Sequence, residues 1–338
     1  MKRFYPLRKD GRFYQTDDHK AAGWFFPTLS LILSTWYQDL FCSVNKEARS
    51  WVVKSSYPER SDKPFFTWLG HSTFLIQIGG KNILTDPIFG NLSFIFARTM
   101  PHKIKIEDLP PIDYIILSHN HFDHMDVSSL LKIKKHNPLV KSLVPMGDKA
   151  WFDEHGFIGT SEHMWWDKIN QNGLKFTFLP AKHWSQRGLF DKNKSLWGSW
   201  MVEHNDFKFY FAGDTGWDQH FATIGKAFKS IDVALMPIGP GEPREWMKHA
   251  HINAEEAGKA FLALKARLFV PMHWGTFRLG LDQFKEPVTR LKNWWLAHKN
   301  ECTHKVLKIV KVGQLVECVH ENIVALSRLK SKSRSKVL

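Results

Sequence analysis

The feature that most constrains the fold is a run of metal-binding side chains directly after an apolar segment. The segment is IDYIIL (residues 112–117), and the run that follows it is SHNHFDH (residues 118–124). An apolar run of this length between turn signals is typical of a buried strand. Clustered imidazoles and carboxylates are costly to bury without a cation, so this run indicates a metal site at the end of a strand. A polar loop with chance histidines is the weaker alternative, since the chain has 18 of them.

Spacing within the run predicts two metal positions. His119 and His121 alternate, so they can point the same way from an extended segment. Asp123 and His124 follow one turn later and can reach a second position, at a metal–metal distance of roughly 3.5–4 Å. No thiolate is at hand for a closed structural site, and a disulfide scaffold is excluded, because no CxxC pair is formed by the three cysteines, Cys42, Cys302 and Cys318.

The apolar pattern in the middle of the chain is repeated. A first hairpin is predicted from residues 66–78 through a turn at 79–82 to residues 83–86, which end in Asp86. A second hairpin runs from residues 199–204 through a turn at Asn205-Asp206 to Asp214. Each hairpin is followed, after a connecting segment, by an apolar run that suits a buried strand, at 112–117 and at 231–236. This repetition suggests a duplicated architecture with two stacked sheets.

Helical segments lie between and after these strands. Helices are expected at residues 127–135, at 287–298 and after Asn253, where Glu256 stands in the position of a capping box. Hydrophobic residues make up 43% of the chain, which excludes disorder of the whole chain. The predicted class is α/β (α+β), with two sheets and with helices on their outer faces.

The net charge is +14, from 47 lysine and arginine residues against 33 aspartate and glutamate residues. A basic surface suits nucleic acid, anionic lipid or a phosphorylated substrate, and net charge does not choose among them. Five basic residues lie within the first 12 positions and five lie after position 327. Short basic tails of this kind are most often solvated, but beside an apolar segment they also favour an anionic membrane.

The apolar segment nearest the basic N-terminus is the aromatic-rich stretch WFFPTLSLILSTWYQDLF at residues 24–41. It is too short for a membrane span, and Pro27, Gln38 and Asp39 interrupt it. The charged and polar residues before it, and the lack of a small-residue cleavage site after it, argue against a signal peptide. We interpret it as an arm that either packs on the protein's own body or lies in a membrane interface.

The run His119-x-His121-x-Asp123-His124 resembles the signature of the metallo-β-lactamase fold superfamily. The resemblance implies an αββα sandwich of two mixed sheets with helices on the outer faces, and a binuclear site at one edge that usually holds zinc. It also implies three further ligands downstream, each after a strand. The chain supplies them in order, as His183 in LPAKHW, Asp214 in FAGDTG and His273 in VPMHWGTF.

The resemblance is closer still to the N-acyl-phosphatidylethanolamine phospholipase D family. It covers residues 64–320 and rests on the motifs WLGHST, LTDPIF, PPIDYIILSHNHFDH, LWGSW, FAGDTGW, PIGPGEPREWMKHAHINAEEA and HWGTF. The family likeness implies seven ligands to two zinc ions, although iron or manganese can also occupy such sites. One ion would be held by His119, His121 and His183, and the other by Asp123, His124 and His273, with Asp214 bridging both.

The implied reaction is hydrolysis of N-acyl-phosphatidylethanolamine-like membrane phospholipids to phosphatidic acid and N-acylethanolamine. Two dications can lower the pKa of a bridging water to near neutrality, so that hydroxide attacks phosphorus without a covalent enzyme intermediate. Asp123, Asp214 and His251 are the expected catalytic residues, with His251 either supporting a metal ligand or transferring a proton. Phe122 and His273 are expected to contact substrate, and Phe122 stands where this family commonly has tyrosine.

Two strand-end residues, His71 and Asp86, are expected to support the metal ligands through hydrogen bonds. Ordinary turn chemistry is the alternative for both. His251 is expected near the metals, whereas His249 is interpreted as an exposed loop residue.

The predicted organisation is an N-terminal arm at residues 1–63, a catalytic domain at 64–320 and a basic C-terminal tail at 321–338. The implied partners are a phospholipid substrate and an anionic membrane surface, and the implied location is cytoplasmic with peripheral membrane association. The tryptophan pairs at 165–166 and 294–295 could be core, membrane-facing or the contact of a homodimer. No nucleic-acid partner is expected, because no separate binding module is visible and basic residues gather at the termini.

The alternative function is a soluble metal-dependent hydrolase of the same fold, either a lactonase or a hydrolase of small or cyclic phosphodiesters. Such enzymes share every metal ligand, so only the surface that delivers the substrate separates them from the lipid hydrolases. The aromatic arm and the basic tails favour the lipid.

Overall fold

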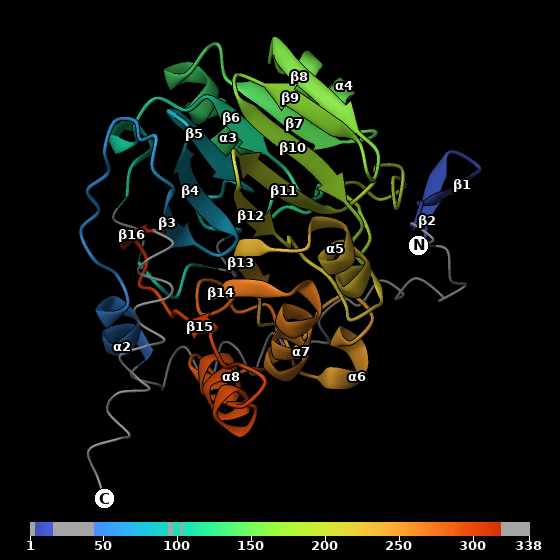
Figure 1. Ribbon diagram of the computed structural model, residues 1–338. Coiled ribbons are helices and arrows are strands. Elements are labelled where there is room, and N and C mark those ends of the chain that lie inside the picture. The colour runs from blue at the N-terminus through green and yellow to red at the C-terminus, as the bar shows by residue number, and fades with distance from the viewer. Residues whose placement is uncertain (1–3, 16–43, 94–96, 102–103, 319–338) are drawn as a thin grey trace, which may run out of the picture.

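Two stacked β-sheets form the centre of the computed structural model, which describes residues 4–15, 44–93, 97–101 and 104–318 (Figure 1). The first sheet has the strand order β16-β3-β4-β5-β6-β7-β8 and the second has the order β15-β14-β13-β12-β11-β10-β9. The strands of the first sheet are β3 (Phe65–Gly70), β4 (Thr73–Ile78), β5 (Lys81–Thr85), β6 (Tyr114–Ile116), β7 (Lys141–Pro145), β8 (Gly159–His163) and β16 (Leu315–Glu317). Those of the second are β9 (Lys168–Gln171), β10 (Leu174–Leu179), β11 (Ser199–His204), β12 (Phe207–Phe211), β13 (Ile231–Pro237), β14 (Ala266–Met272) and β15 (Val306–Leu307).

The pairing of the strands confirms the predicted duplication. In the first sheet β3, β4 and β5 pair antiparallel, and β5 to β8 then pair parallel. In the second sheet β10, β11 and β12 pair antiparallel, and β12 to β15 then pair parallel. One further antiparallel strand, β16 or β9, completes the edge beside β3 or β10. Both sheets are therefore mixed, as predicted.

The predicted boundaries of the first hairpin are wrong at one point. Residues 66–78 were expected as a single strand but form two, β3 and β4, which pair antiparallel around a reversal at His71 and Ser72. Gly70 has a φ of 102° and His71 a φ of 52°, a left-handed backbone that allows this tight reversal. Apolar and β-branched residues continue on both sides of the turn, so the pattern of hydrophobicity conceals it.

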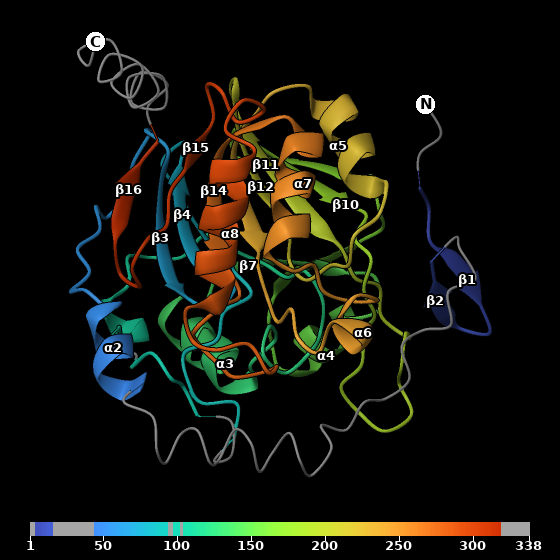
Figure 2. The same ribbon diagram turned by 90° about the horizontal axis from the view of Figure 1, so that it is seen from below.

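All three expected helices are present. The helices of the described residues are α2 (Val44–Ser50), α3 (Val127–His136), α4 (Lys149–Glu154), α5 (His220–Phe228), α6 (Arg244–Met247), α7 (Ala254–Leu264) and α8 (Glu286–Ala297), with a 3-10 turn at Ile106–Asp108. The capping box before α7 is formed as predicted, because Glu256 N donates to Asn253 Oδ1 at 2.9 Å and Asn253 N donates to the Glu256 carboxylate at 3.4 Å. Helices α5, α7 and α8 pack together over the outer face of the second sheet (Figure 2). Helix α4 packs against β8 of the first sheet.

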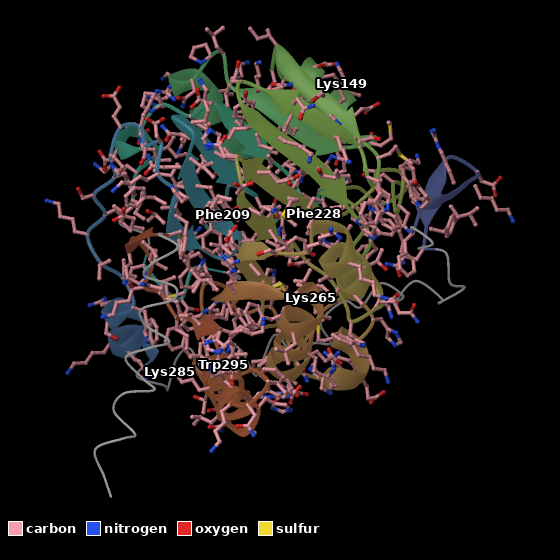
Figure 3. All side chains as sticks on the ribbon, viewed as in Figure 1. Lys149, Phe209, Phe228, Lys265, Lys285 and Trp295 are labelled. Carbon is pink, nitrogen blue, oxygen red and sulfur yellow. The ribbon has the colours of Figure 1, made fainter. Side chains whose placement is uncertain are left out.

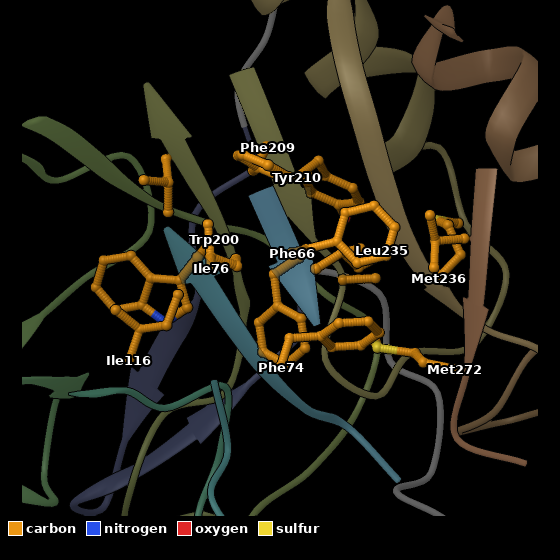
Figure 4. Packing of buried hydrophobic residues seen from close by; sticks show 14 of the residues in the cluster. Phe66, Phe74, Ile76, Ile116, Trp200, Phe209, Tyr210, Leu235, Met236 and Met272 are labelled. Atoms are coloured by element: carbon orange, nitrogen blue, oxygen red, sulfur yellow. The ribbon is translucent and has the colours of Figure 1, made fainter. Parts of the chain in front are cut away.

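The hydrophobic core lies between the two sheets. Figure 4 shows Phe74 and Ile116 from the first sheet beside Trp200 and Leu235 from the second, and all four are fully buried. Trp200 Nε1 donates to Leu117 O at 2.7 Å and so links the sheets at the end of β6. Each large apolar side chain buried in this way contributes about 1.5–3 kcal/mol. In Figure 3 the apolar side chain of Phe209 lies in the interior of the molecule, whereas the charged side chains of Lys149 and Lys285 lie at its periphery.

Parts of the predicted N-terminal arm pack on the body. Strands β1 (Leu7–Lys9) and β2 (Arg12–Tyr14) form a small hairpin with a buried Phe13, whose N–H donates to Asn193 O at 2.7 Å. Trp51, just after α2, contacts Trp274 edge-on with ring centroids 5.1 Å apart. The stretch 24–41 and the tail 321–338 lie outside the described residues, so their proposed contact with membranes and the division of the chain at 64 and 320 stay predictions. Among the described residues, no helix combines the length and apolar character needed to span a membrane.

A buried histidine at the end of β8 predicts a pH-dependent stability. His163 is 7% exposed and its Nε2 pairs with Ser161 Oγ at 2.8 Å. Burial lowers the pKa of His163 to about 4. Because this pKa is below that of an unfolded histidine, the unfolded chain takes up the proton first, and stability is lost as the pH falls from about 6.5 toward 4.

Between pH 8 and pH 5 we expect wild type to lose about 2 kcal/mol more free energy of unfolding than His163→Gln, which does not titrate. Urea unfolding of both proteins at each pH measures the difference. Equal losses in the two proteins would show that His163 contributes nothing to the pH dependence.

Candidate metal centre

The predicted site residues converge at one edge of the sandwich. Asp86 follows β5, His119 follows β6, Asp214 follows β12 and His273 follows β14 directly, and all of these strands belong to the parallel parts of the sheets. Parallel strands present their carboxyl ends at a common edge, so the side chains after them come together. Residues 71 and 273 join the two sheets here, because His273 N donates to His71 O at 3.2 Å.

A first group consists of His119, His121 and His183. His119 Nε2 lies 2.8 Å from His121 Nδ1, which in turn lies 3.2 Å from His183 Nε2. The outward nitrogens of two of these rings are held by hydrogen bonds. His183 Nδ1 donates to Ala250 O at 2.9 Å, and His119 Nδ1 pairs with Ser118 Oγ at 2.8 Å. The three inward nitrogens therefore face one common point.

A second group consists of Asp123, His124 and His273, together with His71. Asp123 Oδ2 lies 2.9 Å from His71 Nε2, 3.4 Å from His124 Nε2 and 3.6 Å from His273 Nε2. The Nε2 atoms of His124 and His273 are 3.3 Å apart. These four residues present ligand atoms that all lie within 4.8 Å of one another.

Asp214 lies between the two groups. Its Oδ1 is 3.1 Å from His273 Nε2, and its Oδ2 is 3.3 Å from His124 Nε2. On the other side, Asp214 forms a further compact set with His183 and with His251, whose Nδ1 is 3.5 Å from Asp214 Oδ2. The preceding Gly213 has a φ of 58°, and a Cβ there would come within 2.4 Å of Ser118 Cβ. A glycine is therefore required for Asp214 to approach this closely.

Electrostatics divide the imidazoles into two classes. Burial lowers the pKa of His119 well below its usual value, that of His121 to about 4 and that of His183 to about 3. The first group is therefore neutral and offers lone pairs.

In the second group burial also lowers the pKa of His71, to about 3, but His124 and His273 behave in the opposite way. Burial disfavours charge on His124 and His273, yet the neighbouring Asp214 and Asp123 raise the pKa of His273 to about 9 and that of His124 well above its usual value. The same imidazoles hold the pKa of both carboxyl groups well below the usual range, against the effect of burial. Positive charge is thus favoured at the place where these four side chains meet.

Hydrogen bonds from neighbouring residues orient the metal-binding side chains. His124 Nδ1 donates to Asp86 Oδ2 at 2.7 Å, and Ser118 donates to the same carboxylate through N and Oγ, at 2.7 and 2.5 Å. Both His124 and Asp86 are fully buried. The backbone is left-handed at His71, Asp86 and His273, with φ values of 52°, 32° and 58°. Such backbone strain is concentrated at functional sites.

These residues fit a divalent cation. The inward nitrogens of the first group face one another at 2.8 and 3.2 Å, and three lone pairs at such distances repel unless a cation lies among them. A tetrahedral zinc site with Zn–N bonds of about 2.1 Å places its nitrogens about 3.4 Å apart, which is close to this arrangement. Nitrogen and carboxylate ligands without thiolates also suit zinc, iron or manganese.

The structure adds residues that the sequence analysis does not identify. Arg187 donates to Asn120 O at 2.9 Å and to Met125 O at 2.8 Å, and its guanidinium lies 4.7 Å from the Phe122 ring. Asn120 Nδ2 donates to the buried Asp148 at 2.9 Å. Both contacts hold the loop that carries His119 to His124, but they come from distant segments without a motif, so no signal in the sequence points to them.

The remaining expected residues lie around the mouth of the site. Phe122 is 59% exposed, His251 is half-buried and His249 is exposed, as the sequence analysis expects of His249. A pocket that is partly open to solvent adjoins the centre, lined by His273, Phe277, Phe284 and neighbouring residues.

Comparison with known proteins agrees with this geometry. A model of the beta-lactamase superfamily domain matches residues 81–274. The chain is 39% identical over 244 residues to N-acyl-phosphatidylethanolamine-hydrolyzing phospholipase D 1 of Caenorhabditis elegans, covering 68% of both chains. It is 37% identical over 252 residues to the mitochondrial N-acyl-phosphatidylethanolamine-hydrolyzing phospholipase D of Saccharomyces cerevisiae, and these cover 70% of this chain and about half (53%) of the yeast protein.

A solved structure shares the fold. Igni18, a metallo hydrolase from the archaeon Ignicoccus hospitalis, superposes with a TM-score of 0.59 over 75% of this chain and 97% of its own, at 23% identity. The chain therefore belongs to the beta-lactamase superfamily, as a member of the family of N-acyl-phosphatidylethanolamine-hydrolyzing phospholipases D, and it is a metal-dependent hydrolase of metallo-β-lactamase fold.

Proposed function

We propose that the protein is a binuclear zinc phosphodiesterase that hydrolyses N-acyl-phosphatidylethanolamine-like membrane phospholipids. The products would be phosphatidic acid and an N-acylethanolamine. The observation that carries the proposal is the position of Asp214. Its carboxylate lies 3.1 Å from His273 and 3.3 Å from His124 on one side, and it forms a compact set with His183 on the other. A carboxylate placed in this way suits two cations held close together.

The proposal divides seven ligands between two ions. His119, His121 and His183 would hold one ion, and Asp123, His124 and His273 the other, with Asp214 shared between them. Bound dications supply two things, a lowered pKa for water and positive charge against the phosphate oxygens.

The reaction makes one bond and breaks one. The oxygen of water joins phosphorus, the bond between phosphorus and the ethanolamine oxygen breaks, and the proton passes from water to the departing oxygen. His251 is the proposed proton-transfer group, because its Nδ1 is buried, has no hydrogen-bond partner and faces Asp214. Burial lowers the pKa of His251 to about 3, so this ring is unprotonated in the metal-free protein.

Two features of the mouth support a lipid substrate. Phe122 presents an exposed ring beside His121, which suits contact with an apolar chain or with the glycerol backbone. The pocket beside His273 is partly aromatic, through Phe277 and Phe284, and could receive a portion of the substrate next to the metals. Peripheral association with an anionic membrane surface is part of this proposal, since the substrate resides there.

Mass spectrometry of the products from a mixed membrane-lipid extract tests the proposal. We expect purified enzyme to deplete N-acyl-phosphatidylethanolamine and to release phosphatidic acid and N-acylethanolamine in equal amounts. An Asp214→Asn enzyme, treated in parallel, should leave the extract unchanged. Lactones opened faster than any phospholipid is cleaved would instead favour a soluble hydrolase of the same fold.

A further inference from the structure

Two large apolar side chains project into solvent from the connection between β10 and β11. Leu189 is 76% exposed and Phe190 is 80% exposed, and they follow Gly188 in the sequence. We refer to residues 188–190 as the tip. A single exposed apolar residue needs no explanation, but an adjacent pair this exposed forms the start of a patch.

The tip is held in place by hydrogen bonds. The Asp191 carboxylate accepts hydrogen bonds from the backbone N–H groups of Arg187, at 3.2 Å, and Gly188, at 2.8 Å. Arg12 of β2 donates to Phe190 O at 3.2 Å and also to Lys192 O. These polar contacts present the apolar pair to solvent instead of folding it inward, so the exposure is built into the loop.

The tip lies at the rim of the metal centre. Arg187, the residue before it, contacts the backbone of Asn120 and Met125 and lies over the ring of Phe122. Leu189 and Phe190 are two and three residues from Arg187, so their Cα atoms lie within about 11 Å of its Cα. Phe122 is itself 59% exposed between two of the proposed ligands. The tip and the exposed Phe122 ring are therefore linked through Arg187 beside the metal centre.

The segment that carries the tip is rich in basic residues. Between residues 182 and 194 the chain has four lysine or arginine residues and one acid, Asp191, which is turned to the backbone. Lys192 Nζ lies 5.5 Å from the Trp184 ring, and that ring lies 4.2 Å from His121. Apolar side chains at the centre with aromatic and cationic groups around them match a bilayer of anionic phospholipid, whose phosphates lie above its acyl chains.

We propose that the tip inserts into an anionic phospholipid surface and so holds the opening of the metal centre against the membrane. This contact is separate from the aromatic stretch at residues 24–41. The biological purpose of this membrane contact rests on the proposed function, but membrane binding itself requires no hydrolysis.

The test is sedimentation with vesicles of phosphatidylcholine and about one third phosphatidylglycerol, which contain no proposed substrate. The double substitution Leu189→Ser/Phe190→Ser should lower the partition coefficient of the protein by about 100-fold, because it removes the apolar area that enters the bilayer. Binding of wild type should weaken as salt rises from about 50 to about 500 mM. Phe190→Trp, which keeps the ring and favours the interface, should strengthen binding several-fold over wild type.

The matched control is Leu139→Ser/Ile158→Ser. These residues are 79% and 76% exposed, and they precede β7 and β8, at the edge opposite the metal centre. The control should bind like wild type, and all variants should keep the wild-type unfolding midpoint. Equal binding by wild type and the tip variant, or no binding by wild type, overturns the inference whatever the enzyme hydrolyses. Lost binding in the tip variant alone supports it, even if the lipid extract yields no N-acylethanolamine.

Discussion

Replacing Asp214 by asparagine is expected to lower the rate of hydrolysis by at least about a thousandfold and to reduce bound metal from two ions to about one per chain. Asp214 lies 3.1 Å from His273 and 3.3 Å from His124 in one half of the centre, and it forms a compact set with His183 of the other half. An amide has one oxygen and no charge, so it cannot bridge two cations or offset their repulsion.

The fold should survive this change. In the metal-free protein Asp214 holds protons on His124 and His273, and these rings can lose their protons when the carboxylate is gone. No buried charge is then left without a partner. The half-buried Asp218, four residues along, provides the control, because Asp218→Asn should retain both metals and full rate. Metal analysis by mass spectrometry and steady-state rates measure both effects, and full activity in Asp214→Asn would show that the ligand assignment is wrong.

The second large effect is expected from a substitution of Asp86, which is not one of the seven proposed metal ligands. Asp86→Asn should lower metal affinity about 10–100-fold, because the tautomer of His124 would change. The carboxylate now accepts from His124 Nδ1 at 2.7 Å, which leaves Nε2 free to bind a cation. The amide oxygen of asparagine would pair with Ser118 N, so its NH₂ group would face His124 Nδ1. The ring proton would then move to Nε2 and block the ligand atom.

Zinc titration against a competing chelator measures this affinity. Asp232→Asn is a matched control, since Asp232 is 1% exposed, accepts from Lys208 N at 2.9 Å and lies in the other sheet. Both changes should lower the free energy of unfolding, but the Asp232 variant should bind zinc like wild type. Wild-type zinc affinity in Asp86→Asn would indicate that Asp86 serves only the turn after β5.

Much of the centre is predictable because its chemistry is local. His119, His121, Asp123 and His124 stand within six positions after an apolar run, and burying them without a cation is unfavourable, so the sequence alone implies a metal site. The duplicated sheets are predictable for a similar reason, since each repeats a hairpin and a buried strand. The turn at His71 is not, because its conformation depends on Gly70 and on contacts with Thr276 and His273 from the other sheet.

Other features depend on contacts between distant segments. Arg187 reaches the metal loop from 62 to 67 residues away, and nothing in the letters around it marks that role. The exposure of Leu189 and Phe190 is equally invisible in the sequence, where the pair resembles a short core segment. The loop that carries them is held by Arg12 of the N-terminal hairpin, which donates a hydrogen bond to Phe190 O. Three-dimensional structure is therefore needed to tell an apolar residue at the rim of the site from one in the core.

Hydrolysis in oxygen-18 water tests whether water attacks phosphorus in an N-acylated phospholipid. Purified enzyme, N-acyl-phosphatidylethanolamine and labelled water are incubated together, and both products are analysed by mass spectrometry. We expect one labelled oxygen on the phosphate of phosphatidic acid and none on the N-acylethanolamine. Label on the N-acylethanolamine would place the attack on carbon and show that the proposed reaction is wrong.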